Sequence, residues 1–224
     1  MLMIPLIYGC SVDNHSSRVV SGVAAAGAAM VNVPISLMDS SQRVKQLTTT
    51  SGPDGSYSFI VESLTPPYIL KATSGGKTYY SLSTTVGTAN ISPYTTMVLS
   101  VASGGVDMDI FYNSYNAEEL RIVAGKIDVA LRTIRVKLQP LLSTFHNGDK
   151  NPMTDTFCAD HTGLDALFDV VTVDFFRWET VTLRNCGTNE IFYTGKVRDF
   201  TGGVFDRTRM PNSSTHALDT QGEL

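Results

Sequence analysis

The chain has 224 residues, of which 42% are hydrophobic and only 17% charged. This length suits one large domain or two small ones and is enough to bury a core. The apolar share and the formal net charge of −4 exclude a disordered acidic tail and a basic nucleic-acid-binding protein. No stretch reaches the roughly 18 apolar residues that a membrane-spanning helix needs.

The first ten residues resemble the end of a bacterial lipoprotein signal peptide. Residues 1–8 are apolar, Gly9 and Cys10 follow, and the aliphatic Ile7 stands three positions before the cysteine. In such lipoproteins this cysteine becomes the lipidated first residue, so we expect Cys10 to carry a lipid anchor. The run is short and lacks the basic residues that usually begin an export signal. The alternative is a buried strand that ends in a core thiol.

Residues 18–93 show short apolar clusters separated by turn-forming residues, which is typical of β-structure. In the turn Ser51-Gly52-Pro53-Asp54-Gly55, glycine supplies positive φ and proline a fixed φ. Six short strands in this space favour a β-sandwich. The expected strands are Arg18–Val23, Val31–Met38, Val44–Thr50, Ser56–Val61, Tyr68–Thr73 and Thr78–Leu82.

The pattern changes after Pro93, and residues 94–198 are expected to form an α+β part. Tyr94–Ala102 fits either a strand or a first helix. Over residues 117–142 the apolar residues recur at spacings of four and three, which predicts one long amphipathic helix. Asn116 is a suitable N-cap for it. Its basic face could bind anions, but in an acidic chain we expect that face simply to be solvated.

A polar loop over residues 143–162 precedes a short predicted helix. Thr162 and Asp165 have the spacing of a capping box at its start. Strands follow at Val170–Phe175, Glu179–Asn185 and Glu190–Thr194, with a hairpin signal at residues 187–189. Residues 199–224 are polar and lack periodicity, so they are expected to form a tail or a loosely packed arm.

Three runs of the first half resemble the carboxypeptidase regulatory-like domain, which is a transthyretin-like β-sandwich. They match its G-x-V opening strand, its alternating second strand and its T-x-x-D-G-x-Y-x-F hairpin. These runs are Val20-Ser21-Gly22-Val23, residues 31–37 and residues 50–59, and residues 64–72 extend the match. The resemblance implies a mostly β protein with helices: an N-terminal transthyretin-like or Ig-like sandwich followed by a helix-containing α+β part.

Two further segments are similar to segments of bacterial exported proteins. Residues 90–96 match N-[VI]-[ST]-P-[LF]-T-T, and residues 157–169 match F-x-A-D-G-T-G-x-D-x-L-L-D, with His161 in place of the usual Gly and Phe168 in place of Leu. The resemblance therefore spans roughly residues 18–195. It implies export and says little about activity, since in true carboxypeptidases this sandwich is an accessory domain without catalytic residues.

The sequence shows no constellation that indicates an enzyme. His15, His146, His161 and His216 lack the spacing of a zinc triad. Nucleophile-elbow, P-loop and dinucleotide-binding motifs are absent from the sequence. A nucleophilic pair of Cys158 and His161 is conceivable, but cysteine in an exported chain is usually oxidised. We therefore expect a non-catalytic protein.

The polar loop is a candidate Ca²⁺ site. Its carboxylates at Asp149, Asp155 and Asp160 could supply some of the six to eight oxygens that this ion takes. The spacing is not that of an EF-hand, and the favoured alternative is that these residues form caps and turns. No other cofactor is expected.

The cysteine count of three is odd for an exported protein. With Cys10 lipidated, Cys158 and Cys186 remain as an even pair in an oxidising compartment. A disulfide between them would stabilise the fold by about 3–4 kcal/mol in the chain-entropy model. The alternative is two buried thiols.

The expected function is adhesion, scaffolding or assembly at the cell envelope or outside the cell, including self-association through strand edges. Partners would be other envelope proteins or a second copy, the membrane through the lipid anchor, and no nucleic acid. The protein would be an outer-membrane lipoprotein, periplasmic or on the cell surface.

The alternatives are a carbohydrate-binding or other ligand-binding module, or the accessory domain of a secreted hydrolase. The first would use exposed aromatic residues, although most of them are expected in the core or at its rim. The candidates are Tyr68, Tyr79, Tyr80, Tyr112, Tyr115 and Trp178.

Overall fold

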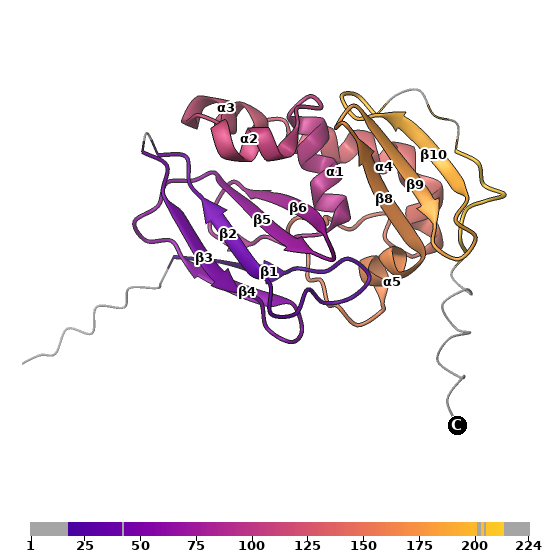
Figure 1. Cartoon of the computed structure of the whole chain (residues 1–224), viewed down its shortest axis with the longest axis horizontal. Coiled ribbons are helices and arrows are strands. Elements are labelled where there is room, and N and C mark those ends of the chain that lie inside the picture. The colour runs from indigo at the N-terminus through magenta and orange to yellow at the C-terminus, as the bar shows by residue number, and fades with distance from the viewer. Residues whose placement is uncertain (1–17, 42, 201–202, 204, 213–224) are drawn as a thin grey trace, which may run out of the picture.

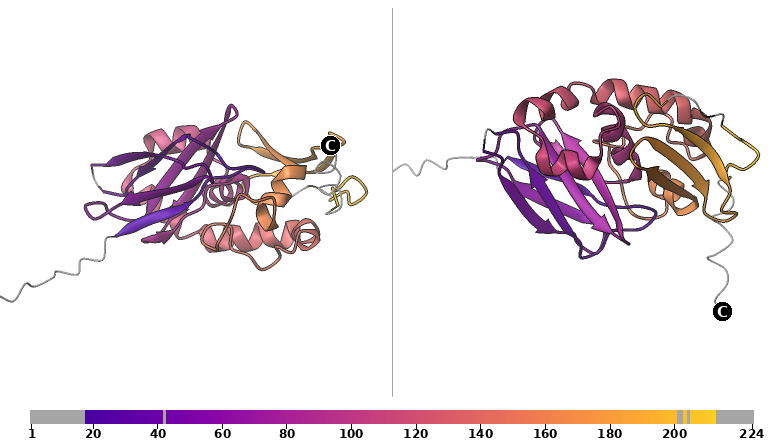
Figure 2. Two further views of the ribbon diagram at one scale, coloured as in Figure 1. Left: turned by 90° about the horizontal axis from the view of Figure 1, so that it is seen from below. Right: turned by 45° about the horizontal axis from the view of Figure 1, so that its top comes forward.

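A computed structural model describes residues 18–41, 43–200, 203 and 205–212 (Figure 1). The described chain has an α+β fold, with strands at both ends and helices between and over them (Figures 1 and 2). Cys10 and the lipoprotein-like segment lie outside the described residues. None of the helices that the structure describes is long and apolar enough to cross a membrane.

The N-terminal strands form two sheets. The first has the order β4-β1-β7, and the second the order β3-β2-β5-β6. Side chains from both sheets, among them Val20, Ile35, Phe59 and Leu70, form one hydrophobic cluster. The six expected strands are confirmed with shifted bounds: β1 (Val19–Val23), β2 (Pro34–Met38), β3 (Gln46–Thr50), β4 (Ser56–Ile60), β5 (Tyr68–Ser74) and β6 (Lys77–Ser83), to which β7 (Gly87–Thr88) is added.

Strand β1 pairs with β4 on one side and in parallel with β7 on the other. This second pairing explains the glycine of the opening motif. A Cβ atom at position 22 would overlap the carbonyl oxygen of Ala89. Gly22 therefore lets the chain after β7 run close against β1, where Ala89 N–H donates to the Ser21 carbonyl over 2.7 Å.

Strands β5 and β6 are buried on both faces. Leu70 belongs to the cluster between the two N-terminal sheets, whereas Ile69, Tyr80 and Leu82 belong to a larger cluster with the helices and the C-terminal strands. This explains the continuous apolar run at the start of β5, because a strand that is covered on both faces needs apolar residues on both.

Residues 93–102 form a helix, α1 (Pro93–Ala102), which settles the alternative that the sequence left open. Ser92 is its N-cap and makes a reciprocal capping box with Thr95, and Pro93 occupies the first turn. Helix α2 (Met108–Ser114), which follows, was not expected from the periodicity; its N-cap is Asp107.

The prediction of one helix over residues 117–142 was wrong. Two helices, α3 (Ala117–Ala124) and α4 (Ile127–Thr144), are separated by Gly125 and Lys126. Gly125 is the C-cap of α3, and glycine costs about 1 kcal/mol relative to alanine inside a helix. The apolar spacing continued across the break because both helices contribute to the same core. The predicted N-cap, Asn116, is confirmed and forms a capping box with Glu119.

The C-terminal part begins with α5 (Gly163–Val170) and continues into an antiparallel sheet of order β10-β9-β8. Its strands, β8 (Val171–Phe176), β9 (Thr180–Asn185) and β10 (Ile191–Lys196), confirm the three predicted ones. Part of the predicted tail packs on the core: Phe200 is buried and stacks on Tyr193 with ring centroids 5.3 Å apart. Residues 213–224 of that tail lie outside the described residues.

The capping box predicted at α5 does not form. Thr162 is the N-cap residue but makes no side-chain cap bond. Its hydroxyl donates instead to Asp160 over 2.7 Å, and the Asp165 carboxylate accepts the backbone N–H of His161 over 2.9 Å. Both side chains thus bond residues that stand two or three positions before the helix rather than each other across its first turn.

Threonines of α1 close the open edge of β6. The Tyr80 N–H donates to Thr96 Oγ1 over 2.9 Å, and Thr95 Oγ1 donates to the Tyr80 carbonyl over 2.9 Å. Both hydroxyls are buried, so they replace the neighbouring strand that β6 lacks. Thr95 and Thr96, the last two residues of the motif at residues 90–96, therefore both end the sheet and hold α1 against it.

Asn90 of the same motif connects β1 to the loop before α5. Its Oδ1 accepts the Val23 N–H over 3.2 Å, and its Nδ2 donates to the Asp155 carbonyl over 2.8 Å. Its own N–H donates to Met153 over 2.9 Å. We call residues 90–96 the connecting segment, because it ties the N-terminal sheets to both later parts of the chain.

The variant Thr96→Val tests this edge closure. It keeps the shape of the side chain but leaves the buried Tyr80 N–H without an acceptor, so we expect the free energy of unfolding to fall by about 1–3 kcal/mol. The matched control is Thr50→Val at an exposed position of β3, which should change that energy by less than about 0.5 kcal/mol. Urea denaturation measures both. Equal effects at the two positions would contradict the role given to Thr96.

Candidate functional site

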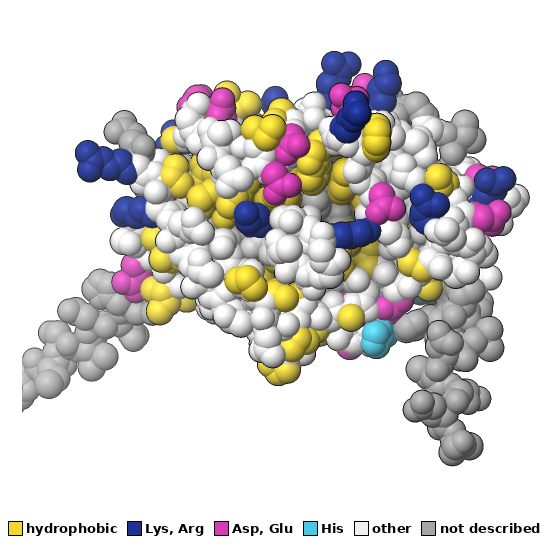
Figure 3. All heavy atoms as spheres, viewed as in Figure 1, with side chains coloured by type: hydrophobic (Ala, Val, Ile, Leu, Met, Phe, Trp, Pro, Cys, Tyr) yellow, Lys and Arg dark blue, Asp and Glu magenta, His cyan; other side chains and the backbone are white. Residues whose placement is uncertain are grey.

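An open pocket lies where the N-terminal and C-terminal strands approach each other. Its volume is about 230 Å³. The start of β6, the first turn of α1, the end of β8 and the β8–β9 turn supply its walls. The lining residues are Lys77, Thr78, Tyr79, Pro93, Thr96, Val173, Asp174, Phe175 and Trp178. In the space-filling view, hydrophobic side chains lie in the hollow of this face and charged side chains surround it (Figure 3).

Aromatic rings form one wall of the pocket. Phe175 and Trp178 stack with ring centroids 4.7 Å apart, and the edge of Trp178 meets the buried ring of Tyr80 at 6.2 Å. Trp178 is only partly buried, as is Tyr79 on the opposite strand. The indole is therefore held from behind and leaves part of its surface toward the pocket.

The turn that carries Trp178 has an unfavourable backbone. Arg177 and Trp178 have φ values of 51° and 56°, and Glu179 N–H donates back to the Phe176 carbonyl over 3.1 Å. These are the features of a type I′ hairpin turn, whose two central positions favour Asn-Gly. Bulky residues at positive φ cost on the order of 1–2 kcal/mol each. The packing of Trp178 offsets that cost, and such strain is concentrated at functional sites.

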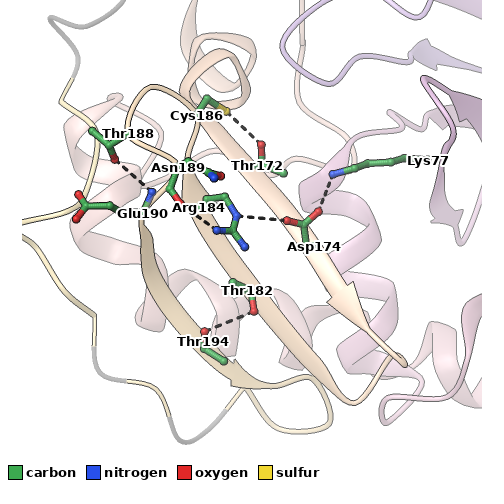
Figure 4. Close-up of polar contacts among 10 residues, drawn as sticks. All are labelled: Lys77, Thr172, Asp174, Thr182, Arg184, Cys186, Thr188, Asn189, Glu190 and Thr194. Carbon is green, nitrogen blue, oxygen red and sulfur yellow. Dashed lines mark hydrogen bonds and ion pairs between the residues drawn. The ribbon is translucent and has the colours of Figure 1, made fainter.

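A charged pair stands at the polar rim of the pocket (Figure 4). Lys77 Nζ on β6 lies 2.7 Å from Asp174 Oδ1 on β8, and Arg184 Nε on β9 lies 4.0 Å from Asp174 Oδ2. Lys77 and Asp174 are each a little under half exposed, so the pair contributes little to stability. It does fix the carboxylate of Asp174 beside the aromatic wall.

The rim continues into the open face of the C-terminal sheet. Asp174, Thr182 and Thr194 lie opposite one another across the three strands, and the two threonine hydroxyls are 3.5 Å apart (Figure 4). The same face carries Thr172, Thr180 and Arg184. A ligand that extends out of the pocket would meet hydroxyl groups and charges along this face.

Tyr79 supplies a hydrogen-bond donor. Burial raises the pKa of Tyr79 above its ordinary value, and the Asp174 carboxylate adds to the shift. The phenol therefore keeps its proton at neutral pH. Together, the lining offers apolar rings, a carboxylate, an ammonium group and hydroxyls. Linings of this kind are typical of sites for small amphipathic ligands. The ionisable side chains among the lining residues are Lys77, Asp174 and Tyr79.

Most of the aromatic candidates from the sequence are core residues. Tyr68, Tyr80, Tyr112 and Tyr115 are all buried. Only Tyr79 and Trp178 of the six reach the pocket. Phe175, Lys77 and Asp174 were missed by sequence reasoning because nothing local marks them: they lie on two strands that are 97 positions apart at the ion pair.

The predicted Ca²⁺ ligands are dispersed. Asp155 Oδ2 accepts the Asn151 N–H over 3.0 Å, and Asp160 Oδ1 bonds Thr162, as turn and capping residues do. Asp155 and Asp160 line the same small pocket together with Lys150, and Asp149 does not line it. The structure thus supports the local roles for Asp155 and Asp160 and does not bring the three carboxylates together.

The two described cysteines, Cys158 and Cys186, are exposed free thiols. Cys158 lies in the polar loop, and Cys186 follows β9, where its Sγ is 3.2 Å from Thr172 Oγ1 (Figure 4). The structure therefore does not support the predicted disulfide, and the alternative of buried thiols is wrong because both are exposed. Both predictions fail because the side chains of Cys158 and Cys186 are exposed to solvent and are not bonded to each other.

The variant Arg177→Gly tests the strain of the turn. Glycine adopts positive φ without a steric cost, so we expect the free energy of unfolding to rise by about 0.5 kcal/mol or more, the lost contact of Arg177 with Phe176 opposing part of the gain. The control is Lys196→Gly, which removes an exposed basic residue from β10 and should destabilise by about 0.5–1 kcal/mol. Thermal or urea denaturation measures the change in the free energy of unfolding of both variants. A loss of stability for Arg177→Gly as large as that of the control would contradict the strain.

Comparisons of the chain with protein-family models, curated proteins and solved structures gave no match.

Proposed function

We propose that this protein is a non-catalytic binding module for a small carbohydrate, held in the pocket between β6, β8 and α1. The observation that carries the proposal is the partly exposed Trp178, which a strained turn places beside Phe175 at the pocket wall. A type I′ turn of Asn and Gly would form more easily. The strained backbone of Arg177 and Trp178 destabilises this turn, but it places an aromatic surface at the mouth of the pocket.

A sugar ring matches the chemistry of this lining. One face of a pyranose is made of C–H groups, which pack on aromatic rings, and its edge carries hydroxyls that need donors and acceptors. Asp174 accepts, Lys77 and Tyr79 donate, and all three line the pocket. The volume of about 230 Å³ is below the roughly 300–1,000 Å³ of pockets for drug-sized ligands, so it suits one sugar unit.

The proposed setting is the cell envelope. The lipobox-like segment that ends at Cys10 implies export and a lipid anchor, and the N-terminal sheets with their shared core fit the proposed transthyretin-like sandwich. In this setting the sandwich serves as a rigid support for the pocket. A module of this kind serves adhesion when it stands alone, and serves as an accessory domain when a secreted hydrolase acts on the same sugar.

Binding to an array of mono- and oligosaccharides tests the proposal. We expect the full-length protein to bind at least one class of sugar, and Trp178→Ala to weaken the best ligand at least tenfold in calorimetry, because stacked aromatic surface is lost. The matched control is Phe176→Ala. Phe176 precedes the same turn and is 65% exposed on the open face, outside the pocket lining, so this variant should retain the affinity within about threefold.

Two results would overturn the proposal. One is a properly folded protein that binds no sugar of the array at millimolar concentration. The other is equal loss of affinity in Trp178→Ala and Phe176→Ala, which would place the ligand on the open sheet face rather than in the pocket. Asp174→Asn separates the contribution of the carboxylate from that of ring stacking. It should weaken sugar binding while leaving the rings of Phe175 and Trp178 in place.

A second candidate function, self-assembly, is favoured by strand β3. Among the described strands it pairs only with β2, so its other edge is open, and the side chains of Gln46, Thr48 and Thr50 on this strand are exposed. In contrast to β6, none of the described helices closes this edge. A regular open edge of this kind is a template for adding a strand from a second copy.

The double variant Thr48→Lys/Thr50→Lys tests assembly, because paired lysines repel a copy at this edge. We expect concentration-dependent oligomers of the wild-type protein in sedimentation velocity and a monomer for the variant. Thr180→Lys/Thr182→Lys, in the central strand β9, is the control and should oligomerise as the wild-type protein does. A wild-type monomer up to about 1 mM would exclude this function.

A further inference from the structure

A second group of ionisable side chains lies on α5 and just before it, and shares no residue with the pocket. His161, Asp165 and Asp169 each offer one ligand atom, and these atoms all lie within 4.8 Å of one another. The three residues are spaced by four, which places the two aspartates one turn apart on the same face of α5. His161 precedes the helix with φ of 61°, and its Nδ1 lies 3.1 Å from both carboxylate oxygens of Asp169.

Asp165 provides an independent sign that this group is incomplete. Its side chain is 0% exposed. One oxygen, Oδ2, accepts the His161 N–H, whereas the part of the chain that the structure describes gives Oδ1 no hydrogen-bond partner. A buried carboxylate oxygen without a partner costs about 1–3 kcal/mol or more. A positive charge would satisfy it, and ligand atoms of His161 and Asp169 lie within 4.8 Å of this carboxylate.

We propose that His161, Asp165 and Asp169 bind a divalent first-row transition-metal ion. The imidazole and the two carboxylates then serve as three ligands on one side of the ion. The positive charge of the ion gives Oδ1 of Asp165 the partner that it lacks. His161 is 57% exposed at its side chain, so an ion can reach the cluster from solvent. The ion takes the place of the imidazole proton that otherwise faces Asp169.

The ligand chemistry selects the class of ion. Zn²⁺ and Mn²⁺ accept mixed imidazole and carboxylate ligands, and three protein ligands with water are common for zinc. Ca²⁺ takes six to eight oxygens, and this cluster offers it two carboxylates. The site is also distinct from the oxygen-rich loop expected from the sequence, since it uses neither Asp149 nor Asp155 nor Asp160.

Calorimetric titration of the full-length protein with ZnCl₂, MnCl₂ and CaCl₂ tests the proposal, after the thiols are alkylated so that they do not compete. We expect one equivalent of Zn²⁺ or Mn²⁺ to bind and Ca²⁺ to bind at least tenfold more weakly. His161→Asn, which tolerates positive φ, and Asp169→Asn should each weaken the transition-metal ion at least tenfold. Both variants leave the buried Asp165 in place, so folding is retained.

The matched control is Asp160→Asn, which removes the carboxylate next to His161 but keeps the oxygen that caps Thr162. It should bind the ion within twofold of the wild-type protein. The proposal is overturned by a protein that binds no equivalent of either transition-metal ion, by binding that His161→Asn and Asp169→Asn leave unchanged, or by a preference for Ca²⁺ that Asp160→Asn removes. Electron paramagnetic resonance of bound Mn²⁺ provides a second readout of the same site.

Discussion

The architecture depends on the hydrogen bonds of the connecting segment, residues 90–96. Thr95 and Thr96 occupy the backbone donor and acceptor of Tyr80 at the edge of β6, and Asn90 joins β1 to the loop before α5. All of these polar groups are buried or nearly so, where an unmade hydrogen bond is expensive. The segment therefore sets where the N-terminal sheet stops, where α1 begins and how the C-terminal part meets both.

The pocket is a consequence of that constraint. Because α1 ends the sheet at β6 instead of another strand, the edge of β8 approaches β6 without pairing with it, and Lys77 and Asp174 bridge the remaining separation at 2.7 Å. The first turn of α1 supplies the floor, and the β8–β9 turn carries Trp178 over it. A continuous sheet across β6 and β8 would have left no cavity. The two threonines that stabilise the fold thereby create the space in which the proposed ligand binds.

Residues with positive φ position functional side chains at both ends of the C-terminal part. At the β8–β9 turn, positive φ at Arg177 and Trp178 places a ring at the pocket wall. At α5, positive φ at His161 turns the chain so that its ring faces Asp169. The spacing of His161, Asp165 and Asp169 was visible in the sequence, but Asp165 also matched a capping box. The structure shows that Asp165 accepts the His161 N–H instead of closing a capping box and that its carboxylate is buried, and burial is a tertiary property.

The sequence by itself determined the local elements. Alternating apolar residues located the six strands of the N-terminal part, Asn116 located a helix start, and Gly187 to Asn189 located a hairpin, because side-chain period and turn chemistry act over a few residues. It did not reveal the helix break at Gly125, since two helices that face one core keep a common apolar spacing. Only the tertiary structure decided which strand edges meet, which aromatic rings stay partly exposed and that Cys158 and Cys186 are separate exposed thiols. These features depend on contacts between residues far apart in the chain, whose pairing no local pattern encodes.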